Sequence, residues 1–507
     1  MQVVVTGQEM QLIEGQTRER LGVSPLLLME NAGSRIVEVL KQEYGPVQNK
    51  RIHILAGMGN NGGDGLVVAR QLLLLGARPK VYLVGNLQKS SPEHKVNLEI
   101  LRKLGIDVIH AELGQLAKLK FSLNLADLIV DALFGTGFKA NLGPELAALI
   151  NLVNDLGQPL VAVDVPSGVN ACTGQVEHTA CRADLTINLG FLKTGCLLHP
   201  GQAYAGKNIV VDLGFPLDFS PNIHRYLLGQ ETLDLLPPRV PWGHKGTFGH
   251  TLVVGGSQVY VGAPALSGYA ALRGGGGMTT VAVPQGIVSR FQADELIVSP
   301  IADNSEGNLG VNSLPQLVKL LEHKDALVVG PGLGSHPETI SMVQELLRRW
   351  SGPTVLDADA LKALTEEFLN SLPDSQRRQW IITPHPGEMA CLIRSDASRV
   401  NANRLAVAVD FAKKWGINVV LKGAPSIITD GEKTYINSTG NHGLATAGTG
   451  DVLAGLIGAL LAQGLQPLEA GCVGVYAHGA AADLVARQGA RGLIASDLLN
   501  KLREILS

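Results

Sequence analysis

A glycine-rich turn that ends in an aspartate, T-A-G-T-G-D at residues 446–451, is the stretch best suited to chemistry on a phosphate group. An apolar run of small residues follows at 452–462 and predicts a helix. The first turn of a helix has free backbone N–H groups and the positive end of the helix dipole, so it attracts anions. Asp451 could cap this helix, or it could take a proton from a substrate hydroxyl beside a bound phosphate. On this stretch alone, both interpretations stay open.

Two other loops of the second half carry groups that suit nucleotide phosphates. The segment K-G-A-P-S at 422–426 could hold a phosphate through its backbone and the Lys422 ammonium. The segment T-P-H-P-G-E at 383–388 could orient a substrate or hydrated Mg²⁺. His385 lies between two prolines, which excludes a helix interior but leaves a structural and a ligand-binding role open. The motif G-x-x-x-x-G-K-[ST] is absent, which excludes a P-loop nucleotide hydrolase.

Three polar loops of the first half each follow an expected strand, and in a parallel sheet all three would open at the same carboxyl edge. The strands are expected at 51–56, 125–130 and 160–163, and the loops at 57–65, 131–141 and 164–168. Asn61, Asp131 and Ser167 could supply oxygens to one cation, while Asp64 and Asp164 could face a bound molecule. The glycines could also serve the turns alone. The dinucleotide fingerprint G-x-G-x-x-G is absent after the first strand, which disfavours a hydride-transferring enzyme.

The composition is that of a well-packed globular protein. Of its 507 residues 45% are hydrophobic and 17% charged, and no apolar run reaches the ~18 residues of a transmembrane helix. A net charge of -3 and an aromatic content of 4% predict no binding to nucleic acid or to acidic membranes. The five cysteines are odd in number and lack C-x-x-C spacing. A disulfide framework or zinc site is therefore disfavoured, and a reducing cytoplasm is expected.

The order of the expected elements predicts two α/β domains, at 1–220 and 221–507. Residues 1–50 are expected to be helical, with helix starts at Thr6 and Ser24. The proline-rich segment 216–241 predicts a linker or a docking segment between the domains. A second series of apolar strands follows, and each strand is followed by a loop that holds glycine or a functional group.

The motifs of the second half resemble the ribokinase-like superfamily. In that superfamily a glycine-rich anion hole precedes a catalytic aspartate, as in G-T-G-D at 448–451. Its small-molecule kinases usually carry T-P-N-x-x-E, whereas this chain has T-P-H-P-G-E at 383–388. That histidine, together with G-P-G-L-G at 330–334 and K-G-A at 422–424, resembles the ADP-dependent NAD(P)H-hydrate dehydratases.

The first half resembles the NAD(P)H-hydrate epimerases. The similarity is carried by N-N-G-G-D-G at 60–65 and by D-V-P-S-G at 164–168. An epimerase followed by a dehydratase in one chain is the order of the bacterial bifunctional NAD(P)H-hydrate repair enzymes. The similarity extends over about residues 9–504, and the joint presence of both motif sets is highly specific.

The resemblance implies two three-layer αβα domains, an N-terminal Rossmann-like sheet and a C-terminal ribokinase-like fold. It implies repair of nicotinamide nucleotides: the first domain interconverts the R and S hydrates of NADH or NADPH, and the second dehydrates the S epimer with ADP. Because hydroxide is a poor leaving group, the ring hydroxyl would be phosphorylated before it is expelled, which gives AMP and phosphate as the other products. Mg²⁺ and K⁺ are the implied ions, and a homo-oligomer in the cytoplasm is expected.

The resemblance also implies a role for each matching residue. In the first domain the hydrate would be bound by Asn60, Asn61, Gly62, Gly63, Asp64, Gly135, Thr136, Gly137, Phe138, Lys139, Ala140, Asn141 and Asp164, and K⁺ by Asn61, Asp131 and Ser167. In the second domain the hydrate would contact Ala263, Gly334, His385 and Asp451, and the adenine nucleotide would contact Lys422, Gly423, Ala424, Pro425, Ser426 and Gly450. Asp451 would take the hydroxyl proton, and Asp164 is the expected acid or base of the epimerase.

Two alternative functions stay open. The first is a ribokinase-like small-molecule kinase fused to a nucleotide-binding domain, which Glu388 and Asp451 permit and His385 disfavours. The second is a non-catalytic scaffold, which the presence of Asp131, Asp164 and the complete N-N-G-G-D-G string disfavours. Release of a phosphorylated product would support the kinase, and failure to bind K⁺ or a hydrated nucleotide would support the scaffold.

Overall fold

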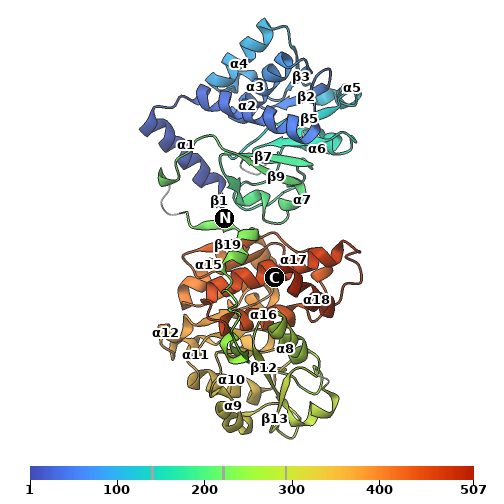
Figure 1. The fold of residues 1–507 in the computed structure, drawn as a ribbon. Coiled ribbons are helices and arrows are strands. Elements are labelled where there is room, and N and C mark those ends of the chain that lie inside the picture. Colours follow the sequence, from blue (N-terminus) through green and yellow to red (C-terminus); the bar gives the residue numbers. More distant parts are fainter. Residues whose placement is uncertain (139–141, 220–222, 292–293) are drawn as a thin grey trace. The chain divides into compact units, whose positions relative to one another are not determined.

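The computed structural model describes residues 1–138, 142–219, 223–291 and 294–507, and it divides the chain into two compact units (Figure 1). One unit, called the N-terminal unit below, comprises Val3–Ile223. The other, the C-terminal unit, comprises Met1–Gln2 and His224–Ser507. Over the described residues, no helix is both long and apolar enough to cross a membrane.

The N-terminal unit is built around a sheet of parallel strands. Its strands are β1 (Gln2–Val5), β2 (Arg51–Ala56), β3 (Arg78–Leu83), β4 (Asp107–His110), β5 (Leu128–Ala132), β6 (Leu160–Val163), β7 (Leu185–Leu189), β8 (Leu192–Lys193) and β9 (Lys207–Val211). Its α-helices are α1 (Gly7–Leu21), α2 (Pro25–Tyr44), α3 (Asn60–Leu74), α4 (Pro92–Lys103), α5 (Leu116–Leu123), α6 (Pro144–Asn154) and α7 (Gln202–Ala205). The main sheet has the order β4-β3-β2-β5-β6-β7-β9, so the strand order reverses between β2 and β5. Ligands of such sheets bind at the carboxyl ends of the strands beside this reversal.

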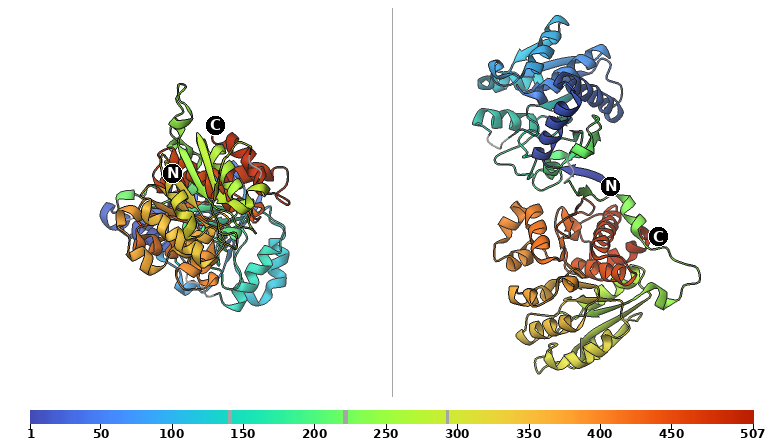
Figure 2. Two further views of the ribbon diagram at one scale, coloured as in Figure 1. Left: turned by 90° about the horizontal axis from the view of Figure 1, so that it is seen from below. Right: turned by 90° about the vertical axis from the view of Figure 1, so that its left-hand side faces the viewer.

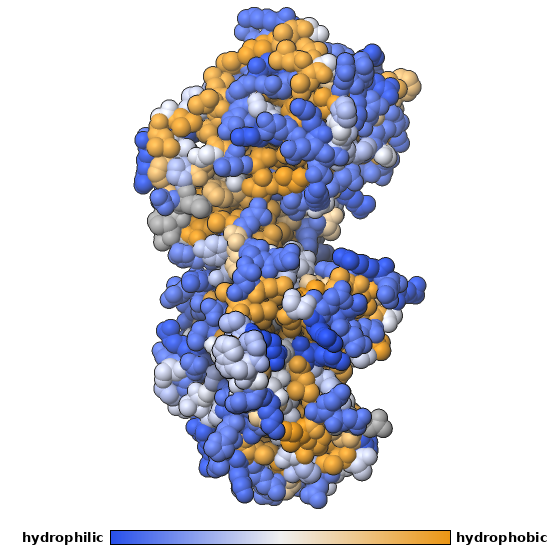
Figure 3. All heavy atoms as spheres, in the orientation of Figure 1, coloured by the Kyte–Doolittle hydropathy of each residue, from blue (hydrophilic) through white to orange (hydrophobic). Residues whose placement is uncertain are grey.

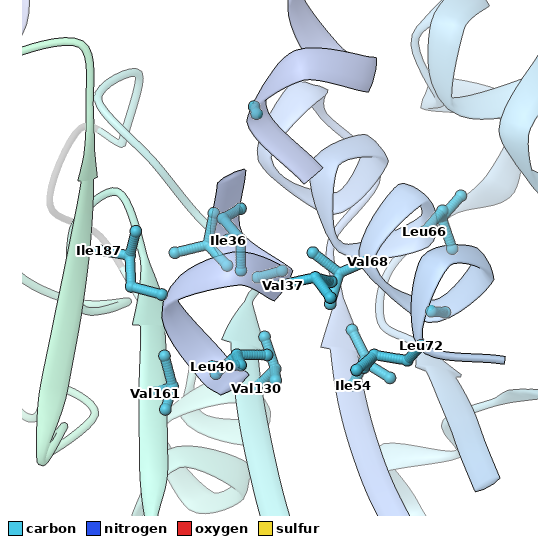
Figure 4. Packing of buried hydrophobic residues seen from close by; sticks show 14 of the residues in the cluster. Ile36, Val37, Leu40, Ile54, Leu66, Val68, Leu72, Val130, Val161 and Ile187 are labelled. Atoms are coloured by element: carbon cyan, nitrogen blue, oxygen red, sulfur yellow. The ribbon is translucent and has the colours of Figure 1, made fainter. Parts of the chain in front are cut away.

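Both faces of this sheet are covered, as the Rossmann-like prediction requires. Alternate residues of a strand point to opposite faces. Ile54, Val130 and Ile187 pack against α2 and α3 on one face (Figure 4). Leu55 and its neighbours on the other face pack in a separate cluster with residues of α5 and α6. The predicted three-layer arrangement is therefore confirmed for this unit.

Two expected elements of the first half differ from the structure. The predicted all-helical stretch 1–50 contains the strand β1, whose β-branched residues pair with β8, with Val4 opposite Leu192. The predicted loop 57–65 is wrong beyond Gly59, because α3 begins at Asn60. The helix can start this early because Gly62 has no side chain and lets the helix approach the preceding turn. A Cβ at Gly62 would lie 1.8 Å from the carbonyl oxygen of Gly57. The helix starts predicted at Thr6 and Ser24 are confirmed, with a capping box at Thr6.

The C-terminal unit is also an α/β structure. Its strands are β10 (Arg225–Leu227), β11 (His250–Val254), β12 (Met278–Pro284), β13 (Ile297–Ile301), β14 (Ala326–Val329), β15 (Thr354–Leu356), β16 (Trp380–Ile382), β17 (Asn418–Leu421), β18 (Ser426–Thr429) and β19 (Thr434–Asn437). Its α-helices are α8 (Ala263–Arg273), α9 (Leu314–Leu321), α10 (Pro337–Arg349), α11 (Glu366–Asn370), α12 (Asp374–Arg377), α13 (Pro386–Leu392), α14 (Ala397–Ala402), α15 (Arg404–Trp415), α16 (Thr449–Ala462), α17 (Pro467–Ala486) and α18 (Ala495–Ile505). Strands β13-β12-β11-β14-β15-β16-β17 are parallel neighbours, and β18 is antiparallel to both β17 and β19.

The sheet of the C-terminal unit is covered by helices on both sides (Figure 2). Val253, Val328 and Val355 share one hydrophobic cluster with residues of α8, α16, α17 and α18. The intervening strand residues are buried on the opposite face, where α15 contacts β17 and β18. In the view of Figure 3, hydrophobic and hydrophilic residues are interspersed on the surface of each unit. Because strands β11 to β17 are parallel, their carboxyl ends lie at one edge of the sheet, and the loops that follow them start there.

Candidate active sites in the two units

A cavity of about 1080 Å³ lies at the carboxyl ends of β2, β5 and β6 in the N-terminal unit. The predicted hydrate-binding residues that line it are Asn60, Asn61, Asp64, Gly135, Thr136, Gly137, Phe138 and Asp164. Gly62 and Gly63 are buried in α3 instead, where Gly62 packs on Gly57 and Gly63 packs on the Met29 side chain. Lys139, Ala140 and Asn141 lie outside the described residues. The structure thus brings most of the predicted residues to one cavity, and two of the glycines serve close packing.

Asp131 and Ser167, two of the predicted cation ligands, are in direct contact. The Asp131 carboxylate accepts hydrogen bonds from the Ser167 hydroxyl at 2.6 Å, the Ser167 N–H at 2.8 Å and the Leu133 N–H at 3.2 Å. Burial raises the pKa of Asp131, and the hydrogen bonds from Ser167 and Leu133 oppose that rise. The Phe134 N–H donates to the Ser167 hydroxyl, which ties the loop after β5 to this pair.

The oxygen atoms around Asp131 have the chemistry of cation ligands. A carboxylate, a hydroxyl and an amide oxygen are hard oxygen ligands, and a nearby cation would favour the ionised form of a buried carboxylate. The side-chain amide nitrogen of Asn61 is buried and has no partner among the described residues. A Cβ at Gly135 would lie 3.2 Å from the side-chain oxygen Oδ1 of Asn61, so the loop after β5 approaches the side-chain amide closely. These contacts are compatible with K⁺ held by Asn61, Asp131 and Ser167.

Four ionisable side chains meet beside the same cavity: Glu14, Asp64, Asp164 and Lys193. Asp164 has a left-handed backbone with φ 69°, and its carboxylate forms an ion pair with the fully buried Lys193. The pKa of Glu14 is raised to about 7, chiefly by burial and also by the Asp164 carboxylate, while Lys193 and Arg18 oppose the rise. Burial also raises the pKa of Asp64, and Asp164 and Glu14 add to that effect.

Sequence reasoning found Asp64 and Asp164 but missed Glu14 and Lys193. Glu14 lies in the middle of α1, outside any motif, and Lys193 closes the two-residue strand β8. Both reach the cluster through the tertiary fold: Glu14 follows no strand end, and Lys193 lies beyond the loop that follows β7, inside β8. No local sequence pattern marks them.

A second cavity, of about 740 Å³, lies in the C-terminal unit. Ala263, His385 and Asp451 line it, together with Ala447 of the predicted anion turn. Gly334 is linked to the cavity through Asp359, a lining residue whose carboxylate accepts the Gly334 N–H at 2.9 Å. Three of the four predicted hydrate contacts therefore line one cavity, from α8, the start of α13 and the start of α16, whereas Gly334 is not among its lining residues.

Asp451 lies in the first turn of α16, as predicted, and the helix begins directly after Gly448, whose φ is 91°. The pKa of Asp451 is raised to about 7, chiefly by burial and also by the Asp357 carboxylate, while Lys422 opposes the rise. A carboxyl group with a pKa near the operating pH is suited to general base catalysis. His478 of α17 holds the start of α16 in place, because its Nε2 lies 2.9 Å from the Thr449 carbonyl oxygen. Burial lowers the pKa of His478 to about 4, so the ring is neutral and donates this hydrogen bond.

Lys422 connects the predicted nucleotide loop to the anion turn. Its ammonium forms an ion pair with Asp357 at 2.7 Å, and a Cβ at Gly450 would lie 3.4 Å from its nitrogen. Burial alone would lower the pKa of Lys422, but the carboxylates of Asp357, Glu388 and Asp451 raise it overall. The ammonium is therefore charged and close to the free N–H groups at the start of α16, where a phosphate would be bound.

The rest of the loop 422–426 is held by a buried arginine. The Arg404 guanidinium donates to the carbonyl oxygens of Leu421, Lys422 and Pro425 at 3.0–3.1 Å. Burial lowers the pKa of Arg404 to about 10. Gly423 lies against this guanidinium, and a Cβ there would come within 2.5 Å of it. The predicted loop thus has a fixed backbone, and neither Arg404 nor Asp357 was singled out from the sequence. Asp357 follows the end of β15, so the strand-end rule could have found it.

His385 has a structural role in the helix start that follows it. Its Nδ1 accepts hydrogen bonds from the N–H groups of Gly387 and Glu388, and its own N–H donates to the Glu388 carboxylate at 2.7 Å. Because Nδ1 is an acceptor, the proton of the neutral ring is on Nε2, which lies 3.4 Å from Glu388. The side chain is also 56% exposed and lines the cavity, so the ring can cap α13 and contact a ligand at once.

Two family models match different parts of the chain. The family model of the NAD(P)H-hydrate dehydratases matches residues 251–504, and the model of the YjeF-related protein N-terminus matches residues 26–195. The bifunctional NAD(P)H-hydrate repair enzyme of Moorella thermoacetica is 40% identical, and the alignment covers 99% of this chain and 96% of that protein. The enzyme of the same name from Thermofilum pendens is 37% identical over 98% of this chain and 95% of that protein.

Among solved structures, the ADP/ATP-dependent NAD(P)H-hydrate dehydratase of Bacillus subtilis, co-crystallised with ATP and Mg²⁺, is similar to the chain. It is 28% identical, and the match covers 55% of this chain and 96% of that protein, with a TM-score of 0.48.

Proposed function

The chain belongs to the family of bifunctional NAD(P)H-hydrate repair enzymes, and we propose from its two cavities how it repairs a nicotinamide nucleotide. It is an enzyme that interconverts the R and S hydrates of NADH and NADPH and dehydrates the S epimer. We assign the epimerase to residues 1–220 and the dehydratase to residues 221–507. The assignment is supported by the different chemistry of the two cavities, one beside a buried acid cluster and the other beside an anion-binding helix start.

The dehydratase reaction is centred on Asp451. We place the hydrate in the cavity of the C-terminal unit, against Ala263 and His385, with its ring hydroxyl at the Asp451 carboxylate. Asp451 takes the hydroxyl proton while the oxygen attacks the terminal phosphate of ADP. The N–H groups at the start of α16 and the Lys422 ammonium offset the charge that develops on that phosphate. The lone pair of the ring nitrogen then expels phosphate, which is a far better leaving group than hydroxide, and a C=N⁺ bond forms. The neighbouring carbon loses a proton to give the reduced nucleotide, and AMP and phosphate are the other products.

Mg²⁺ fits this site as an ion held mainly by the nucleotide. Mg²⁺ keeps several waters and needs only one or two protein carboxylates when phosphates supply the other ligands. Glu388 lines the cavity, and its carboxylate lies 3.9 Å from the Lys422 ammonium. Among the described residues there is no group of three or more acidic, histidine or cysteine side chains that could hold a metal by themselves. When bound, Mg²⁺ would neutralise phosphate charge, and Glu388 is the residue that we expect to position it.

The epimerase reaction is centred on Asp164. We place the hydrated nucleotide in the cavity of the N-terminal unit, where Asn60, Asp64 and the loop 135–138 line the walls. K⁺ at Asn61, Asp131 and Ser167 would fix the carboxyl ends of β5 and β6 and would supply positive charge beside the acid cluster. Asp164 is buried and lines the cavity, so its carboxylate can act as an acid or base on the hydrate.

The position of Asp451 carries the dehydratase proposal. Asp451 lies in the first turn of a helix that follows a glycine, it lines a cavity of about 740 Å³, and its pKa is about 7. The same geometry would serve a small-molecule kinase. The two functions differ in their products, because a kinase releases a phosphorylated compound and a dehydratase releases NADH, AMP and phosphate. Incubation with the S hydrate and ADP, followed by phosphorus NMR, distinguishes them: free phosphate equal to NADH supports the dehydratase, and an accumulating phosphate ester contradicts it.

We also propose that the protein works in the cytoplasm as a homo-oligomer. All five cysteines are free in the structure, which suits a reducing compartment. The oligomer is carried over from the family resemblance. Light scattering of the purified chain measures it directly, and a mass of one chain would contradict it.

A further inference from the structure

The acid cluster of the N-terminal cavity contains more ionisable groups than the proposed epimerase uses. Glu14 comes from α1, Asp64 from α3, Asp164 from the end of β6 and Lys193 from β8. Glu14, Asp64 and Asp164 line the cavity, whereas the Lys193 side chain is fully buried behind it. Three acids and one lysine leave the cluster with more carboxyl groups than cations, a condition that favours the protonated form of the acids that Lys193 does not pair with.

Lys193 fixes one oxygen of Asp164 and leaves the other free. The ammonium donates to Asp164 Oδ1 and to the Leu189 carbonyl oxygen, and the Leu189 N–H also donates to Oδ1, at 3.1 Å. Over the described residues, Oδ2 receives no hydrogen bond from the protein. Because Lys193 has no exposed surface, it acts on a ligand only through Asp164. The free oxygen of the carboxylate is thus the one available to a molecule in the cavity.

Glu14 is the second carboxyl group that can meet the same molecule. The charged groups that shift the pKa of Glu14 are Asp164, at the end of β6, Lys193 of β8 and Arg18 on its own helix. Glu14 in turn raises the pKa of Asp64. With a pKa of about 7, Glu14 carries a proton for much of the time at neutral pH. A protonated carboxyl group and a paired carboxylate therefore lie at one cavity, as an acid and a base would.

We propose, building on the epimerase function above, that Glu14 is a catalytic residue that exchanges a proton with the ring nitrogen of the hydrate while Asp164 exchanges one with its hydroxyl. Asp164 Oδ2 takes the hydroxyl proton, and the electron pair of that O–H bond forms a C=O bond. The adjoining carbon–nitrogen bond breaks with its electron pair on nitrogen, and Glu14 protonates the nitrogen. The aldehyde then turns its other face to the nitrogen. Ring closure returns the nitrogen proton to Glu14 and the Asp164 proton to the oxygen.

Breaking the carbon–nitrogen bond explains why this unit inverts the hydrate without dehydrating it. Loss of the hydroxyl group would create a C=N⁺ bond, and the neighbouring carbon could then lose a proton to give the reduced nucleotide directly. That outcome would make the phosphorylation step of the C-terminal unit superfluous. The open-chain aldehyde keeps its oxygen, and both carboxyl groups return to their starting states after each inversion.

The test follows NADH formation from an equal mixture of the R and S hydrates, with ADP and the full-length chain. Wild type is expected to show a fast phase from the S epimer and a second phase limited by conversion of R to S. Glu14→Gln is expected to slow the second phase by about 100-fold or more, towards the rate without protein, with the first phase unchanged. Glu19→Gln, at an exposed position on the same helix, is the matched control and is expected to keep both phases.

The pH dependence separates proton transfer from a packing role. The second phase of wild type is expected to slow as pH rises through about 7, because Glu14 must be protonated to serve the nitrogen. Glu14→Asp retains part of the rate and a fall at high pH, whereas the residual rate of Glu14→Gln shows no such fall. A second phase in Glu14→Gln within about threefold of wild type at every pH overturns the inference. A wild type that leaves the R epimer unconverted overturns the epimerase function itself, so the two failures are distinct.

Discussion

The carboxylate of Asp357 lies 2.7 Å from the ammonium nitrogen of Lys422 and holds it beside Gly450, at the start of α16. The Thr383 hydroxyl donates to the same carboxylate oxygen at 2.7 Å, so Asp357 is fixed from a third loop. An ammonium has three donors, and an ion pair with one oxygen leaves others for a phosphate. Asp357 thus joins the ends of β15, β16 and β17 and places a cation where the proposed reaction develops negative charge.

Replacing Lys422 with methionine is expected to weaken ADP binding. A charge-assisted hydrogen bond to phosphate contributes about 1.5–3 kcal/mol, so the Kd for ADP should rise by roughly 10- to 100-fold. Calorimetric titration with ADP measures this, and Lys413→Met, at an exposed position on α15, is the control. The variant should also melt at a lower temperature, because the buried Asp357 loses its cation. An unchanged Kd would contradict the assignment of the loop 422–426 to the nucleotide.

Replacing Asp451 with asparagine is expected to abolish most of the dehydratase activity. Asparagine keeps the size of the side chain but cannot accept the hydroxyl proton, and general base catalysis contributes about 10²–10⁴-fold. The rate of NADH formation from the S hydrate and ADP should fall by that factor with little change in ADP binding. Asp374→Asn, at a side chain that is 75% exposed, is the control.

The pH dependence of the wild-type dehydratase tests the same residue. Since burial raises the pKa of Asp451 to about 7 and the carboxylate is the active form, kcat/KM should rise with pH through about 7 and then level off. A flat profile between pH 5.5 and 8.5, measured with saturating ADP, or full activity in Asp451→Asn would rule out the proposed role.

Replacing Gly62 with alanine is expected to destabilise the N-terminal unit. The added Cβ would lie 1.8 Å from the Gly57 carbonyl oxygen, so α3 would have to move away from β2. Overpacking of this kind costs about 1–3 kcal/mol. Gly59→Ala is the matched control, because a Cβ there would meet nothing within 4 Å. Urea unfolding followed by circular dichroism compares the two, and equal midpoints would show that the glycine is not needed for packing.

Replacing Glu14 with glutamine is expected to stabilise the protein at high pH. The pKa of Glu14 rises from 4.5 to about 7 on folding, so the folded state binds its proton more tightly than the unfolded state. The stabilisation by that proton is complete below pH 4.5 and is lost as pH rises through 7. At pH 8 the variant should therefore be more stable by about 1–3 kcal/mol, and at pH 4.5 nearly equal to wild type. Thermal melts at both pH values measure this, with Glu19→Gln as control, and a difference independent of pH would contradict it.

Residues that sit at the end of a strand could be found from the sequence, because a strand followed by glycines is a local pattern. Asp131 and Asp164 are found by that rule, and Asp451 is found by the glycine-rich turn before a helix; all three lie at the cavities or beside their walls. Glu14 and Lys193 could not be found this way, because only the tertiary fold brings α1 and β8 to the acid cluster.

The loop predicted at 57–65 shows why secondary structure could not be predicted from local composition alone. Runs of glycine weaken a helix prediction, since each glycine costs about 1 kcal/mol relative to alanine in a helix. In the structure Gly62, Gly63 and Gly65 lie in α3, where each allows close contact with another element. Packing against β2, β5 and α2 outweighs the poor propensity, and that packing is not visible from local composition.

The most direct test of the whole account is the recovery of reduced-nicotinamide absorbance from a mixture of R and S NADH hydrates, with ADP, with ATP and with neither nucleotide. The account predicts complete recovery with ADP, in two phases, and no recovery beyond the spontaneous rate without a nucleotide. Recovery that stops at the S fraction would contradict the epimerase assignment of the N-terminal unit. No recovery with either nucleotide would contradict the repair function altogether.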